Sequence, residues 1–117
     1  MMRQQAESDY RVAKPLENEE IRQLLRELSD WRQEGKQIER IFRFPSSRMA
    51  LQFVNRVANL AEQERHHPDI HIFYDTVRLV LSTHSVGGLT AQDFSLAYKI
   101  DLMVGQDFPQ DGWPQPL

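Results

Sequence analysis

The sequence contains no cysteine among its 117 residues. This absence excludes disulfide bonds, thiolate metal sites and a cysteine nucleophile, and it suits the reducing cytoplasm, where we expect the protein to be. No apolar run approaches the roughly 20 residues that a membrane helix needs. The first stretch, MMRQQAESDYRVAK, lacks the apolar region of a secretory signal. We therefore expect no secretory signal and no membrane association.

Excess positive charge and glycine-rich motifs are absent as well. The formal net charge is −3, so no general basic field exists to attract nucleic acid, and we expect no nucleic-acid partner. The sequence has five glycines but no nucleotide-binding glycine loop, and Gly87-Gly88 is more typical of a turn than of a phosphate site.

Length and composition predict one small soluble domain. Hydrophobic residues make up 40% of the chain and charged residues 26%. A core of this size is small, and a homo-oligomer would bury further surface. We expect a flexible N-terminal segment at 1–15, a single domain at 16–104, and an irregular C-terminal segment with three prolines at 105–117.

Apolar residues with helical spacing indicate two helices in the first part of the chain. The first begins near Asn18, its expected N-cap, and carries apolar residues at 21, 24, 25 and 28, a stripe that Trp31 would continue. The second is the longest and is capped by Ser46 or Ser47. It should end near His66, because the residue before Pro68 is disfavoured in a helix.

Four short segments around two turns indicate strands. The first pair flanks Gly35-Lys36, and the second pair covers 70–73 and 76–83 around Tyr74-Asp75. A last helix begins at Thr90, which has capping-box spacing to Asp93. This order predicts an α+β fold, a four-stranded antiparallel sheet with three helices packed on one face. The other face must meet water, a ligand or a second subunit.

All four histidines of the chain lie between positions 66 and 84. Glu62 precedes His66 by four residues, which places both on one face of the predicted helix. A carboxylate beside an imidazole favours the protonated ring, and such a ring can transfer protons near neutral pH. The alternative is a solvated ion pair at the end of a helix, and spacing alone favours that alternative.

Structural alternatives exist for the other polar residues too. His66-His67 can be a polar cap of the helix C-terminus, His84 an exposed strand end, and Asp93 only a helix cap. A histidine metal site is disfavoured, because Pro68 breaks the helix that would align two of the rings and no HExxH pattern is present. We interpret His71, which alternates with apolar neighbours, as structural.

The spacing of these residues resembles the pterin-4a-carbinolamine dehydratase family. The matching motif is Glu62, His66-His67-Pro68, Tyr74, His84 and Asp93. The flanking stretches LSTHSVGGLTAQD and FPSSRMALQFVNRVANLAE are similar to the family as well, and the resemblance spans about 21–104. It implies the same fold, a four-stranded antiparallel sheet with three helices on one face, and assembly as a homodimer or homotetramer.

The resemblance also implies an activity. Family members remove water from a 4a-hydroxytetrahydropterin to give quinonoid dihydropterin, which recycles the cofactor of aromatic amino acid hydroxylases, and they use no metal and no cofactor. The resemblance implies catalytic roles for His66, His67 and His84. It implies supporting or substrate-binding roles for Glu62, Asp93, Ser82, Thr83 and Pro68.

Two departures and two alternatives accompany this hypothesis. Ile70 stands where many members have tryptophan, and Arg65 where some have an acid, which bears on substrate affinity and on the preferred pterin. A non-enzymatic interaction module is one alternative, because some animal members bind a homeodomain transcription factor. A metal-dependent hydrolase that uses the histidines is the other.

Overall fold

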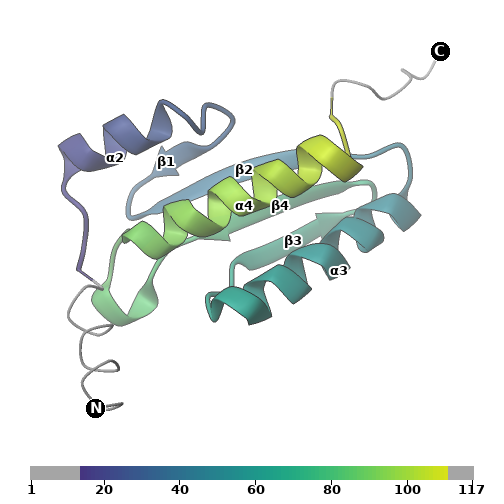
Figure 1. Ribbon diagram of the computed structural model, residues 1–117. Coiled ribbons are helices and arrows are strands. Elements are labelled where there is room, and N and C mark those ends of the chain that lie inside the picture. Colours follow the sequence, from purple (N-terminus) through teal and green to yellow (C-terminus); the bar gives the residue numbers. More distant parts are fainter. Residues whose placement is uncertain (1–13, 111–117) are drawn as a thin grey trace.

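The computed structural model describes residues 14–110 and has the predicted α+β fold, with three helices and one four-stranded antiparallel sheet (Figure 1). Most of the predicted flexible segment at 1–15, and 111–117 of the predicted C-terminal segment, lie outside the described residues. The elements in chain order are α2 (Asn18–Leu25), β1 (Arg32–Glu34), β2 (Gln37–Arg43), α3 (Ser47–Glu64), β3 (Asp69–Phe73), β4 (Thr76–Leu81), a short 3-10 helix (His84–Val86) and α4 (Ala91–Asp107).

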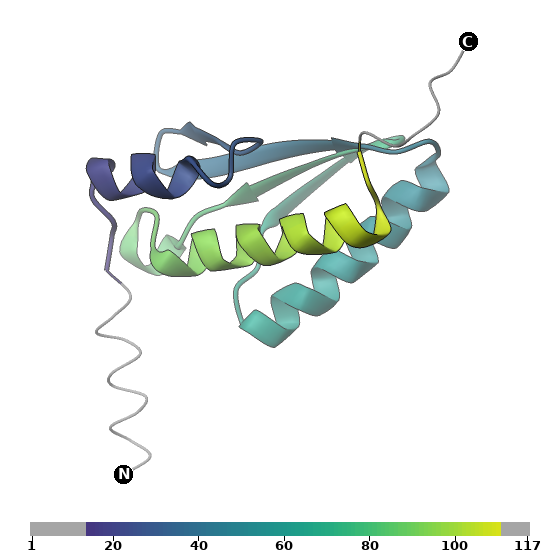
Figure 2. The same ribbon diagram turned by 45° about the horizontal axis from the view of Figure 1, so that its top comes forward.

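The sheet has the strand order β1-β2-β4-β3, and every neighbouring pair is antiparallel. Helices α3 and α4 lie along one face of it, and α2 lies beside the first turns of α4 (Figure 2). The two hairpins therefore contribute one inner strand each, β2 and β4. This arrangement brings the C-terminal end of β4 close to the start of α4.

Strand alternation explains the core. Residues of one parity on β2 and β4 face the helices, and Phe42 lies opposite Val77 in the register of the two strands. The fully buried side chains on this side of the sheet include Ile38, Phe42, Val77, Leu79 and Leu81. From the helices, Phe53 and Ile100 contribute buried side chains to the same cluster. Each such side chain stabilises the fold by about 1.5–3 kcal/mol.

Arg40 shares the core-facing parity of β2, although its side chain is charged. Its guanidinium lies 4.4 Å from the centroid of the Phe42 ring and donates to Oδ1 of Asp101 at 2.7 Å. The charged group thus has an aromatic face and a carboxylate as partners. These contacts explain how the strand tolerates an arginine on its inner side.

The first helix is shorter than predicted and begins with a different cap. Its N-cap is Glu17, not Asn18, and the backbone N–H of Glu17 donates to Oε1 of Glu20 at 2.9 Å. The helix ends at Leu25, so Leu28 and Trp31 do not continue its stripe. Both are nevertheless buried in the core, because the turn after the helix returns them to it.

The C-terminal part of the domain extends further than predicted. Helix α4 continues to Asp107, past the predicted start of the irregular segment at 105. Phe108 follows it and is buried, with its ring 5.9 Å from that of Phe44. The side chain of Gln110 then accepts from the backbone N–H of Arg43 and donates to its carbonyl. The buried side chain of Phe108 therefore anchors this segment to the core. The proline content of the segment had predicted irregular structure and gave no sign of this packing.

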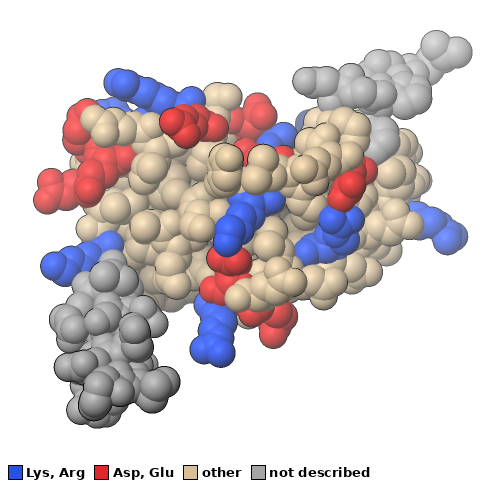
Figure 3. Space-filling model, viewed as in Figure 1, with Lys and Arg blue, Asp and Glu red and all other residues tan. Residues whose placement is uncertain are grey.

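Charged residues are spread unevenly over the helical side of the molecule (Figure 3). The acidic residues Glu19 and Glu20 lie in the first turn of α2, at one end of this side, while much of the surface along α4 carries no charge. Within residues 14–110, no helix has the length and apolar character needed to cross a membrane.

Candidate active site

Three parts of the chain meet at the buried start of α4: the C-terminal end of α3, the end of β4, and the first turn of α4 itself. The connection from β4 to α4 is a tight reversal in which Thr83 forms an isolated bridge with Gly88. Gly87 has a φ of +67°, a left-handed conformation that glycine adopts without strain. The reversal places Thr83, Thr90 and Asp93 next to one another.

Asp93 is the centre of this meeting point, and none of its surface is exposed to solvent. Its Oδ2 accepts from the Thr83 hydroxyl at 2.8 Å and from the backbone N–H of Thr90 at 2.9 Å. Its Oδ1 lies 2.6 Å from Nε2 of His66. The predicted capping box between Thr90 and Asp93 is therefore confirmed. The carboxylate also contacts an imidazole, so capping is not its only interaction.

His66 reaches Asp93 because α3 ends two residues earlier than predicted. The helix stops at Glu64, and Arg65 adopts the left-handed conformation with φ 55°. The backbone N–H of His66 then donates to the carbonyl of Ala61 at 3.1 Å, as at many helix ends. Pro68 was expected to end the helix, but the reversal at Arg65 comes first. It directs the imidazole toward α4.

The predicted pairing of Glu62 with His66 is wrong. Glu62 is paired instead with His67, whose Nε2 lies 3.3 Å from Oε2 of the carboxylate. The i, i+4 relation holds only within a continuous helix, and Arg65 interrupts it. The Glu62 and His67 side chains are 76% and 59% exposed, so this pair is a surface contact, unlike the enclosed pair of His66 and Asp93.

His84 lies at the same end of the sheet, although not on a strand. Strand β4 ends at Leu81, and His84 is the exposed first residue of the 3-10 helix. It directly follows Thr83, which donates to Asp93, and so it is one residue away from the network that holds His66. Ser82, before Thr83, is partly buried, and Pro68, after the histidine pair, is buried.

One residue of this network was missed as a site residue. The hydroxyl of Thr90 lies 2.8 Å from that of Thr83, and both threonines are buried. From the sequence, Thr90 was assigned only as the cap of the last helix, a role it does have, since its Oγ1 accepts from the backbone N–H of Gln92. The capping-box signal placed Thr90 near Asp93. It carried no information on Thr83, which precedes these residues by 7 and 10 positions and lies outside the helix.

The site is suited to proton transfer and offers few metal ligands. His66 is held by the carboxylate of Asp93, which is not exposed to solvent. Two further imidazoles, those of His67 and His84, are exposed. A fixed ring and free rings together can deliver one proton and accept another. Among the described residues, no group of three or more His, Cys, Asp or Glu side chains lies close enough to hold a metal ion.

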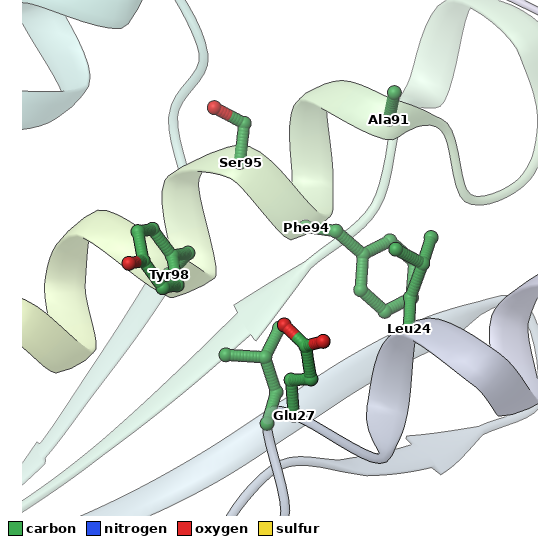
Figure 4. A pocket seen from close by; sticks show the side chains of 7 residues that line it. Leu24, Glu27, Ala91, Phe94, Ser95 and Tyr98 are labelled. Atoms are coloured by element: carbon green, nitrogen blue, oxygen red, sulfur yellow. The ribbon is translucent and has the colours of Figure 1, made fainter.

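A hollow lined mainly by apolar side chains lies elsewhere on the described part of the chain. It has a volume of about 260 Å³ and opens between α2 and α4, where Leu24, Phe94 and Tyr98 are among the residues that line it (Figure 4). Phe94 adjoins Asp93 in sequence, yet none of the predicted site residues lines this hollow. It is therefore separate from the histidine cluster.

Comparison with known families identifies a match for most of the chain. The family model described as pterin 4 alpha carbinolamine dehydratase matches residues 14–103. Among curated relatives, a protein of Thermomicrobium roseum is 47% identical over 85 residues, which cover 73% of this chain and 91% of the relative. A protein of Chloroflexus aurantiacus is 48% identical over 90 residues, covering 77% and 97%. Both are provisionally named as pterin-4-alpha-carbinolamine dehydratases.

Two solved structures are similar in fold. The transcriptional coactivator/pterin dehydratase of Brucella melitensis is 32% identical, with a TM-score of 0.74, and the match covers 77% of this chain and 98% of that one. A pterin dehydratase-like protein identified as a RuBisCO assembly factor in the alpha-carboxysome is 25% identical, with a TM-score of 0.56 and coverage of 65% and 90%.

Proposed function

The chain belongs to the pterin 4 alpha carbinolamine dehydratase family, and we propose that it catalyses the dehydration of 4a-hydroxytetrahydropterin to quinonoid dihydropterin and water. The observation that carries this proposal is the contact of His66 with the buried carboxylate of Asp93, at 2.6 Å, at the end of the sheet where the exposed His67 and His84 also lie. In a cell the reaction would recycle the pterin cofactor of an aromatic amino acid hydroxylase, in the cytoplasm.

The proposed reaction requires two proton movements. The bond between carbon 4a and its hydroxyl oxygen breaks, and that oxygen leaves as water after it receives a proton from an imidazolium. A ring nitrogen of the pterin loses a proton to a neutral imidazole, and the electron pair of that N–H bond forms the new double bond. Positioned acids and bases contribute about 10²–10⁴-fold to such steps.

The three histidines differ in their suitability for these steps. His66 is fixed by Asp93, so its ring has one defined orientation. His67 and His84 are exposed to solvent and accessible to a substrate, and His67 also pairs with Glu62. We propose that Thr83 positions Asp93, while Ser82 and the turn at Pro68 form the edge of the substrate site.

A non-enzymatic role is the second candidate. It is favoured by two of the similar structures, one described as a transcriptional coactivator as well as a dehydratase and one as a RuBisCO assembly factor. An imidazole held by a buried carboxylate is suited to proton transfer, a capacity that an interaction module does not require. Turnover separates the two candidates.

The decisive experiment is dehydration of chemically generated 4a-hydroxytetrahydropterin, followed by ultraviolet absorbance, with a chelator present. We expect catalysis by the wild type and a loss of about 10²–10⁴-fold in a His66→Ala, His84→Ala double variant. His71→Ala is the matched control, because His71 is an exposed histidine on β3 outside the network. Equal activity of the double variant and this control would exclude the assignment.

We also propose a homodimer or homotetramer built on the sheet. Helices α3 and α4 cover one face only, and on the other face Ile41 is 51% exposed at the middle of β2. A second subunit would remove this apolar surface from water. Light scattering at micromolar concentration should give at least twice the monomer mass. A monomeric mass there would contradict the proposal.

A further inference from the structure

The hydrogen bonds around Asp93 have a fixed direction, which follows from the chemistry of each group. A carboxylate only accepts, so the Thr83 hydroxyl must donate its single proton to Oδ2 of Asp93. That proton is then unavailable for the second contact of Thr83, the one with Thr90 at 2.8 Å. The Thr90 hydroxyl therefore donates to Thr83, and it accepts from the backbone N–H of Gln92.

The same reasoning fixes the proton on the histidine. Because Oδ1 of Asp93 can only accept, Nε2 of His66 must carry the hydrogen of their 2.6 Å contact. The neutral ring is then the tautomer protonated at Nε2, and Nδ1 is left with a free lone pair. Within residues 14–110, the only hydrogen bond of the His66 ring is the one between Nε2 and Asp93, which leaves Nδ1 for a substrate proton.

We infer that Thr90 is a positioning residue: its hydroxyl orients Thr83, Thr83 orients Asp93, and Asp93 holds His66 in the tautomer that leaves Nδ1 to exchange the substrate proton. The use of Nδ1 in turnover rests on the proposed dehydration, while the tautomer itself does not. Of these four hydrogen-bonded residues, all except His66 are buried. Thr83 and Thr90 have only 6% and 1% of their surface exposed. Water is therefore a poor substitute for a missing hydroxyl.

The competing role for Thr90 is that of a helix cap alone. Thr90→Val removes the hydroxyl and keeps the size and branching of the side chain, so it loses both the cap and the contact with Thr83. Thr90→Ser keeps both. Ser46→Ala is the matched control, since Ser46 caps α3 by accepting from the backbone N–H of Met49 at 3.2 Å, at the opposite end of α3 from His66.

Two measurements distinguish the roles. The first is kcat for dehydration, which we expect to fall about five- to tenfold in Thr90→Val, the factor that one lost hydrogen bond supports, and to recover in Thr90→Ser. Ser46→Ala should lower the melting temperature and leave kcat unchanged. The same result for Thr90→Val, a lower melting temperature with wild-type kcat, would reduce Thr90 to a helix cap.

The second measurement is the ¹⁵N NMR signal of the His66 ring, assigned by its loss in His66→Gln. At a pH where the ring is neutral, Nε2 should carry the proton in the wild type and in Thr90→Ser, and the two nitrogen signals should move toward each other in Thr90→Val. An unprotonated Nε2 in the wild type would overturn the inference. This readout needs no substrate, so it decides the tautomer even if the protein fails to dehydrate a pterin.

Discussion

Helix α4 carries two buried or partly buried aspartates whose partners differ in kind. Asp93, in the first turn, contacts two threonines and the imidazole of His66. Asp101, two turns later, accepts from the indole N–H of Trp31 at 2.9 Å and from the guanidinium of Arg40 at 2.7 Å. Burial raises the pKa of Asp101, and its bonds to Trp31 and Arg40 oppose that rise.

The difference teaches which buried acid can serve chemistry. An indole N–H and a guanidinium keep their protonation state near neutral pH. The charge of Asp101 therefore only connects α4 to β2 and to the turn before β1. An imidazole does exchange protons in that range. The charge of Asp93 therefore acts on a group that can react, while the charge of Asp101 acts only on structure.

The largest expected effect is that of Asp93→Asn. If the amide oxygen keeps the contacts with Thr83 and the Thr90 backbone, the NH₂ group faces Nε2 of His66, which must then accept. The ring would change to the tautomer protonated at Nδ1, the wrong one for a base at that nitrogen. We expect kcat to fall by about 10²–10⁴-fold, measured in the dehydration assay on folded protein.

Asp101→Asn is the matched control on the same helix. The chemical change is identical, but no titrating imidazole contacts Asp101. We expect wild-type kcat and a loss of about 1–3 kcal/mol in the free energy of unfolding, since Arg40 loses its closest carboxylate partner. Urea denaturation monitored by fluorescence measures this loss. A kcat reduced as much as in Asp93→Asn would remove the distinction between the two acids.

The pH dependence of the Asp101 effect has a definite sign. Its pKa in the folded protein is raised above the ordinary value of 3.8, so the folded state holds this proton more tightly than the unfolded state does. The contribution of Asp101 to stability is then greatest below that value and falls as the pH rises through the folded pKa. The stability difference between wild type and Asp101→Asn should therefore shrink as the pH is raised from about 3.8. A difference that grows over this range would contradict the raised pKa.

The sequence predicted the fold class well because periodicity reports directly on the core. Helical spacing located α2, the two expected pairs of segments correspond to the hairpins β1–β2 and β3–β4, and Ile21 of the predicted stripe is buried. The capping-box spacing likewise located the start of α4. These signals are local, and each depends only on residues within one element.

The partners of the site residues could not be predicted in the same way. Glu62 was assigned to His66 by helical spacing, but the left-handed conformation of Arg65 ends the helix first, and nothing in an arginine residue indicates that conformation. The contact between His66 and Asp93 joins residues 27 positions apart, through a reversal at Gly87-Gly88. Only the family motif had grouped them, and it gave no geometry. Buried Phe108 was missed for a similar reason, since its three-proline context suggested an irregular segment.

The smallest expected effect is that of Glu62→Gln, which tests the exposed pair against the buried one. Glu62 and His67 are both largely open to water, where an ion pair contributes about 0–1 kcal/mol and is screened by salt. Glutamine keeps the size and a hydrogen-bonding oxygen, so kcat should change by less than about threefold, and the change should vanish at high ionic strength. If Glu62→Gln instead lowers kcat as far as Asp93→Asn does, and salt has no influence, then Glu62 contacts the substrate, and the exposed pair is as much a part of the catalytic centre as the buried one.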